Sequence, residues 1–210
     1  MLLDRLLDHF DRVSRLHIDV NDVRDQLIAM GVQDEINFHF VKMDASKIRG
    51  LLYRYERHDA PYGLPKFVSE ILIPQDMGEE AEAWQRLVAV KEMLHITDSD
   101  ELCAMSEQAV DNLFDQFSLP PELRNGLDSG GVGKSFLNDR VRIYAALAVL
   151  LPAICRDKLR PLYESGRLTS REIAEIAKLP VRYIPVVMEE NFSDFIGTII
   201  GWERSEERQE

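Results

Sequence analysis

Three ionisable side chains lie close together in a stretch of sequence that predicts a buried helix. Lys91, Glu92 and His95 follow Arg86, and apolar residues occupy all the remaining positions from Leu87 to Ile96. A helix that is apolar on all sides is usually buried, and a buried charge persists only when it is paired, ligated or used in chemistry. Lys91 and His95 are four residues apart and share one face, with Glu92 one step round from Lys91. These residues are therefore the first candidates for a functional site.

The spacing of these residues is that of the helix His-Glu-x-x-His, in which two histidines bind zinc and the glutamate acts as a general base. Lys91 stands at the position of the first ligand. Zinc takes a neutral imidazole or an anionic ligand, and an ammonium group has no lone pair to offer. Two hypotheses follow. Either His95 binds zinc and Glu92 activates water, or the peptidase-like helix has lost its metal.

The predicted helix over 79–96 needs a buried partner, and the apolar helix predicted over 135–151 is the natural one. Asp139 lies near the start of that second helix, on the same face as Ala146. The alanines around position 146 would allow the two helices to approach closely. We therefore expect Asp139 to lie near Lys91 and His95, either as a third zinc ligand or as a carboxylate that pairs with Lys91.

The order of these pieces resembles the ImmA/IrrE family of zinc metallopeptidase-like proteins. The matching pieces, within about residues 36–195, are Arg86-x-x-x-x-Lys91-Glu92-x-x-His95, Asp139, Ala146, Leu150-Leu151-Pro152 and the segment 168–181. The resemblance implies that His95 is the second metal histidine, Asp139 the third ligand and Glu92 the general base. It also implies a zincin-like minimal metallopeptidase fold, with zinc as the cofactor if the site is functional.

Three departures from the family pattern point to a degenerate site. Lys91 replaces the first histidine, Leu94 replaces a glycine, and Asp139 is one methylene shorter than the family's glutamate. Loss of a protein ligand weakens zinc binding, and a cation in its place repels the metal. We therefore expect no cofactor, with Lys91 forming an ion pair where the metal would lie.

The remaining patterns predict an α+β domain, mostly α, with a small and mainly antiparallel sheet. Strands are predicted at 36–43 and, with looser alternation of apolar and polar residues, at 50–55. A third strand is predicted at 67–74, where a proline ends it. An N-terminal helical arm, 1–33, precedes them, with helices at 2–16 and 20–30, the second capped by Asp19 or Asn21 and stopped by Gly31. The main domain is predicted at 34–202, and a disordered tail at 203–210.

Further helices are predicted after residue 98. Asp98 and Glu101 resemble a capping box for a helix over 99–116. Helices are predicted at 154–164, 169–178 and 181–190, so the region 151–195 has a pattern similar to a helix-turn-helix. The glycine-rich stretch 129–135 resembles a phosphate loop, but the residues before it do not predict a strand, so we expect a loop and no nucleotide site.

Composition restricts the function further. A formal net charge of -12 argues against general nucleic-acid binding, which depends on neutralising phosphates. The sequence has neither a signal-peptide pattern nor an apolar run of about 20 residues, so we expect a soluble, cytoplasmic protein. Cys103 and Cys155 lie in helical patterns and are expected to be reduced thiols.

Three functions are compatible with these observations. The first is a degenerate, metal-free protein of metallopeptidase fold that acts as a regulatory module and binds a protein or peptide partner; the resemblance adds a link to phage or mobile elements. The second is an active zinc-dependent endopeptidase of the ImmA/IrrE type. The third is a DNA-binding regulator that uses the helices at 169–190. The sequence leaves the partner and the oligomeric state open.

Overall fold

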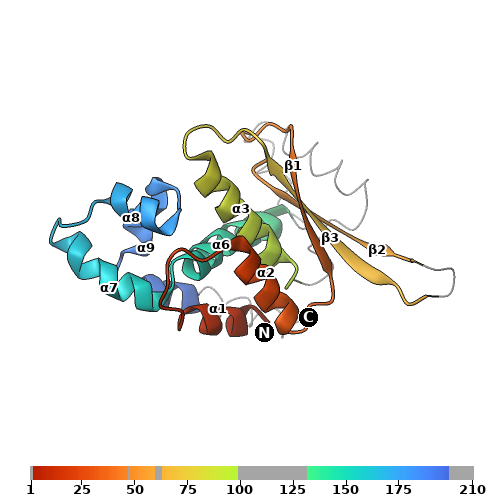
Figure 1. Ribbon diagram of the computed structural model, residues 1–210, viewed down its shortest axis with the longest axis horizontal. Helices are drawn as coiled ribbons and strands as arrows, with labels where there is room; N and C mark the ends of the chain where they lie inside the picture. The colour runs from red at the N-terminus through yellow and green to blue at the C-terminus, as the bar shows by residue number, and fades with distance from the viewer. Residues whose placement is uncertain (1, 47, 60–62, 99–131, 199–210) are drawn as a thin grey trace.

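The computed structural model describes residues 2–46, 48–59, 63–98 and 132–198, with the backbone alone described over 132–140. Three strands form one mixed sheet in the order β1-β3-β2 (Figure 1). Strand β1 spans Glu35–Val41, β2 spans Leu51–Arg57 and β3 spans Lys66–Pro74. The three predicted strands are thus confirmed, with their bounds shifted by one or two residues.

The prediction of a mainly antiparallel sheet is wrong, because β1 pairs with β3 in parallel and only β2 pairs with β3 antiparallel. Because β3 lies between β1 and β2, the connection from β1 leads to the opposite edge of the sheet. The hairpin of β2 and β3 then returns β3 in the direction of β1. Alternation of apolar and polar residues predicts a strand but does not say which strands are neighbours.

Helix α3 (Ala81–His95) lies between the sheet and helix α6 (Val132–Leu150) (Figure 1). It contacts β2 and β3 on one side and α6 on the other. All eight residues from Leu87 to Leu94 are therefore buried, including Lys91 and Glu92. The prediction that this helix is buried on all sides, with the helix of Asp139 as its partner, is confirmed.

The N-terminal helices belong to the same hydrophobic core. Helix α1 (Leu2–Phe10) ends earlier than the predicted 2–16 and packs against α6 through buried residues, namely Leu3, Leu6, Leu7 and Phe10. Helix α2 (Val20–Ala29) contacts α3. Asp19 caps α2 in a capping box with Asp22, and the chain turns at Gly31, whose φ is +108°. The predicted cap at Asp19 and stop at Gly31 are confirmed.

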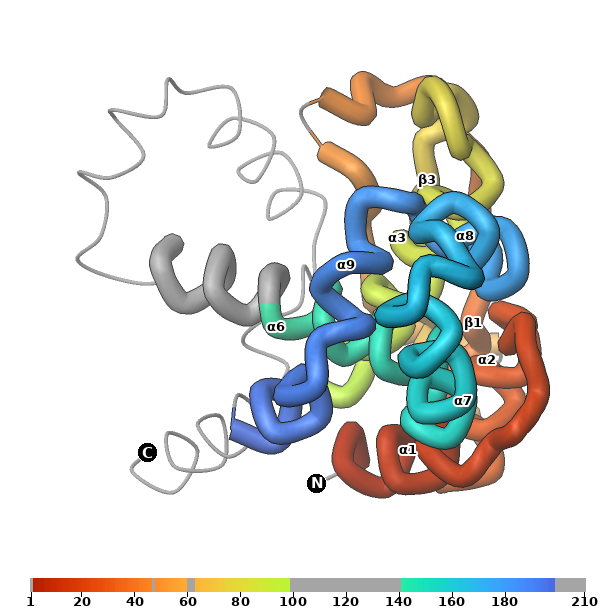
Figure 2. Tube along the Cα trace, turned by 90° about the vertical axis from the view of Figure 1, so that its left-hand side faces the viewer, coloured from red at the N-terminus to blue at the C-terminus, as the bar shows by residue number. Residues whose placement is uncertain are grey.

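After α6 the described part of the chain forms short helices, of which the one that ends at Ala177 lies beside α3 (Figure 2). Helix α7 spans Ala153–Glu164 and α8 spans Ser170–Ala177, as predicted. The continuous helix predicted over 181–190 is wrong. A 3-10 turn, η3 (Val181–Tyr183), is followed by a single turn, α9 (Ile184–Val187), and residues 192–198 are again helical.

Pro185 explains this break, because proline is tolerated only in the first turn of a helix, and α9 starts beside it. Ile184 and Val187 are buried. The element that the DNA-binding hypothesis needs as a recognition helix is therefore a single turn, and its buried residues are Ile184 and Val187.

Several predictions fall outside the described residues. These are the helix at 99–116, the loop at 129–131, Cys103 and the tail at 203–210. Helix α6 begins at Val132, inside the glycine-rich stretch and before the predicted start at 135. Cys155 is a buried free thiol. Across the described part of the chain, no helix is long and apolar enough to cross a membrane.

Candidate functional site

Lys91 and Glu92 form an ion pair inside the protein, as the sequence predicts. Lys91 Nζ lies 2.8 Å from Glu92 Oε1, and the two side chains are only 9% and 4% exposed. The contact lacks the geometry of a hydrogen bond, since Glu92 Oε1 accepts none from the described residues. The short distance still makes it a close Coulombic pair, so the ammonium lies against one of the oxygens that a general base would use.

The backbone at Gly50 covers the Glu92 carboxylate on the side that faces the sheet. Gly50 lies directly before β2, and a Cβ atom built on it would be 2.3 Å from Val88 Cγ1 and 2.6 Å from Glu92 Oε1. No other residue type allows the backbone to come so close to α3 without displacing its side chains. The Glu92 carboxylate is therefore enclosed between the backbone at Gly50 and the ammonium of Lys91.

A second charged cluster lies at the C-terminal end of α3. His95 Nδ1 is 2.7 Å from Asp98 Oδ2, and Arg142 Nε donates to Asp98 Oδ1 at 2.9 Å. Arg142 Nη2 also donates to that oxygen. The Asp98 side chain is fully buried, while His95 is 14% and Arg142 is 4% exposed. Because Arg142 belongs to α6, Asp98 joins the end of α3 to the helix beside it.

The electrostatics of Asp98 follow from these contacts. Burial raises the pKa of its carboxyl, but the hydrogen bond with His95 and the positive charge of Arg142 outweigh burial and lower the pKa below its usual value. Asp98 is thus held as a carboxylate, and its negative charge orients the His95 ring.

Asp98 and Arg142 were not identified as site residues from the sequence. The pattern Asp-x-x-Glu made Asp98 a helix cap, whereas its carboxylate binds His95 and Arg142. Arg142 did carry a usable signal, because it is a cation followed by the apolar run 143–151. A buried arginine in such a helix needs an anionic partner.

Asp139 lies in α6, three residues before Arg142 and nearly one turn away. Its side chain is outside the described part of the structure. Pairing of α3 with α6, on which the prediction for Asp139 depends, is confirmed. The proposed roles of Asp139, as a zinc ligand or as a partner of Lys91, stay predictions.

Arg86, the first residue of the family-like pattern, has a different environment. Its Nη1 donates to the carbonyl oxygens of Ala177, at 3.0 Å, and of Lys178, and its Nη2 donates to that of Ile18. Burial lowers the pKa of Arg86. The guanidinium ties α3 to the C-terminal end of α8 and to the segment before α2, so its position in the pattern is explained by packing.

The described donor atoms do not fit a zinc site. No group of three or more His, Cys, Asp or Glu side chains able to hold a metal ion is found among the described residues. Lys91 offers no lone pair, and Glu92 is engaged by Lys91. His95 and Asp98 lie together, but zinc in proteins usually takes at least three protein ligands.

Comparisons with known proteins identify no relative, since no family model, curated protein or solved structure matches the chain. The similarity to the ImmA/IrrE family and the zincin-like form of the fold therefore stay predictions from the sequence.

Proposed function

We propose that the chain is a non-catalytic regulatory module that binds a protein or peptide partner, on a fold of the metallopeptidase type that has lost its metal. The observation that carries the proposal is the buried ion pair between Lys91 and Glu92. A general base in a metallopeptidase must reach a water molecule on the metal. In this chain the corresponding carboxylate contacts an ammonium group and is covered by Gly50.

One observation favours a second function, that of a zinc-dependent endopeptidase. A zinc-binding histidine usually has its other ring nitrogen hydrogen-bonded to a carboxylate or carbonyl, which fixes its tautomer and orientation. His95 Nδ1 has such a partner in Asp98. In this alternative His95 and Asp139 would hold the metal, and Glu92 would leave Lys91 to act as base.

Zinc content distinguishes the two functions. The wild-type protein, purified without chelator, should contain no stoichiometric zinc by mass spectrometry, and it should not cleave quenched fluorescent peptides when zinc is added. One zinc ion per chain, lost on replacing His95 with glutamine, would overturn the proposal in favour of the endopeptidase.

The variant Lys91→His tests whether the lysine is what excludes the metal. It removes the cation and supplies an imidazole four residues before His95, so zinc uptake should rise sharply. Lys91→Gln is the matched control, because it removes the same charge without adding a ligand. The explanation fails if the histidine variant folds normally and binds zinc no better than the glutamine variant.

A further inference from the structure

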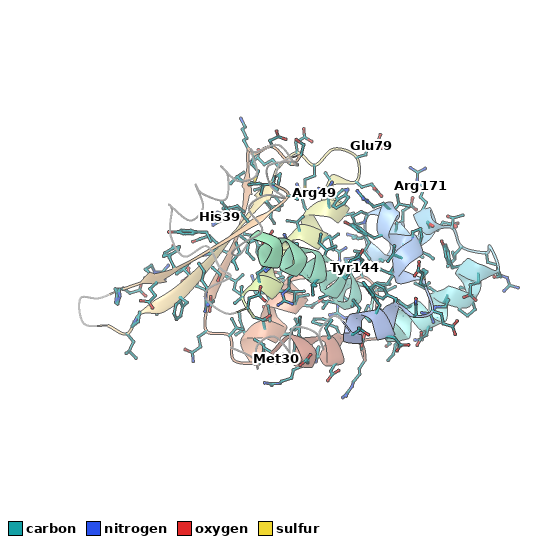
Figure 3. All side chains as sticks on the ribbon, turned by 180° about the vertical axis from the view of Figure 1, so that it is seen from behind. Met30, His39, Arg49, Glu79, Tyr144 and Arg171 are labelled. Carbon is teal, nitrogen blue, oxygen red and sulfur yellow. The ribbon has the colours of Figure 1, made fainter. Side chains whose placement is uncertain are left out.

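Two arginines lie against one tryptophan at the start of α3. The guanidinium carbon of Arg49 is 4.2 Å from the centroid of the Trp84 ring, and that of Arg182 is 5.8 Å from it. Tyr183 packs edge-on against the same ring, with centroids 5.6 Å apart. Both arginines are exposed, and Arg49 lies beside the first turns of α3 (Figure 3). Three segments distant in sequence thus meet at this patch of Arg49, Trp84, Arg182 and Tyr183.

Neither arginine has an acidic partner among the described residues, in contrast to the nearby charges. Lys178 pairs with Glu82 at 3.1 Å, and the Glu80 carboxylate accepts the backbone N–H of Val181 at 2.9 Å. Two cations beside one ring repel each other in a protein whose net charge is -12. An anion between them would relieve that repulsion.

Stacking on an aromatic ring leaves the edge of a guanidinium available. The ring contacts the flat face, while the N–H groups point outward in the plane and can bind a carboxylate through two hydrogen bonds. The stack also holds a long side chain in place, so less conformational entropy is lost when a ligand binds. Arg49, 4.2 Å from the Trp84 centroid, fits this arrangement, and the Arg182 guanidinium carbon lies beside both Trp84 and Tyr183, 5.4 Å from the Tyr183 centroid.

We propose that this patch binds an acidic segment of a partner protein, with aspartate or glutamate carboxylates on Arg49 and Arg182 and the peptide backbone against Trp84 and Tyr183. In an extended peptide, alternate side chains lie roughly 7 Å apart on one side. Two carboxylates with that spacing suit two guanidinium groups that share one ring.

The surroundings favour a short acidic segment over a nucleic acid. Glu79 and Glu80 lie at the start of α3, next to the patch, and the protein as a whole is strongly acidic. A duplex is an extended polyanion that would lie over these acids as well as over the two arginines. A peptide with two or three carboxylates can contact the arginines alone.

This inference rests on the proposed function only in that a partner-binding module needs a binding surface. The patch is separate from the ion pair of Lys91 and from His95. Zinc in the wild-type protein would refute the proposed function without altering the peptide measurement. A lack of peptide binding would refute this inference and leave the zinc result unchanged.

The test is fluorescence anisotropy with a fluorescein-labelled decapeptide that carries four glutamates, compared with the same peptide carrying four glutamines. The acidic peptide should bind more tightly, and binding should weaken with added salt. Arg49→Gln and Arg182→Gln, made separately, should each weaken binding about tenfold or more. Arg171→Gln is the matched control, because Arg171 is exposed on α8, apart from Arg49 (Figure 3), and its loss changes the net charge equally.

Arg49 and Arg182 are both exposed, so each variant should retain the circular dichroism spectrum and melting temperature of the wild type. Equal binding of the two peptides would overturn the proposal, as would an equal loss of affinity in Arg171→Gln. A labelled DNA duplex or phosphopeptide that binds through Arg49 and Arg182 while the glutamate peptide does not would also overturn it.

Discussion

Replacing Lys91 with methionine should destabilise the protein strongly, because the Glu92 carboxylate would remain buried without the cation beside it. Methionine keeps much of the volume and the apolar stem of lysine, so the change acts mainly on charge. Removal of one partner from a buried ion pair costs about 3–5 kcal/mol. That is a large part of the roughly 5–15 kcal/mol by which a typical domain is stable.

The structure gives the reason why removal of both charges should cost less. At 2.8 Å and an effective dielectric constant of about 20, the attraction between Lys91 and Glu92 is roughly 6 kcal/mol. Desolvation of two nearly buried charges offsets most of this attraction. The double variant Lys91→Met/Glu92→Met should therefore lie within about 2 kcal/mol of the wild type. Since loss of either partner alone should cost about 3–5 kcal/mol, the coupling energy should be at least about 4 kcal/mol.

Urea denaturation at pH 7, followed by far-ultraviolet circular dichroism, measures these free energies of unfolding. Lys158→Met is a suitable control, because Lys158 is exposed on α7 and its replacement should change stability by less than about 0.5 kcal/mol. A double variant as unstable as the sum of the two single variants would refute the reasoning, since it would show that the two charges do not depend on each other.

Two further predictions concern the contacts around α3. Asp98→Asn should reduce the loss of stability that the wild-type protein shows as the pH is lowered. A carboxyl whose pKa is lowered in the folded protein stabilises that protein above the unfolded pKa of about 3.9, and this contribution is lost as the pH falls through the folded pKa. Melting temperatures from pH 7 to 2 check this, and parallel profiles for the two proteins would contradict it. Gly50→Ala should cost about 1–3 kcal/mol, because its Cβ would collide with Val88. Gly197→Ala, which meets no atom within 4 Å, should not destabilise the protein in the same urea assay.

The order and type of most elements could be predicted from the sequence, because both depend on local patterns. The capping box at Asp19 and the breaker at Gly31 fix α2 within a few residues. The parallel pairing of β1 with β3 could not be predicted in this way, since it depends on β2 lying at the opposite edge of the sheet from β1. The break at Pro185 was visible in the sequence, but the apolar run around it favoured a continuous helix.

In the candidate site, too, the residues joined by local spacing could be predicted and those joined by long-range contacts could not. Lys91, Glu92 and His95 were found because they share one helix and fixed spacing brings them together. The bond between Asp98 and Arg142 joins residues 44 positions apart, and a local motif gave Asp98 a plausible but different role. Gly50 carried no signal at all, because its contact with Glu92 arises only when β2 packs onto α3.

The ion pair with Lys91 gives the buried Glu92 carboxylate a structural role that requires no catalysis. In a metallopeptidase helix the metal ion is the cation that makes a buried carboxylate tolerable. In this chain the cation is part of the protein, and it lies 2.8 Å from the carboxylate. The presence of Glu92 is therefore no sign of hydrolysis, because Glu92 and Lys91 stabilise each other. Lys91→His exchanges this internal cation for a metal from solution, so the stability of that variant, unlike that of the wild type, should rise with added zinc and fall with a chelator.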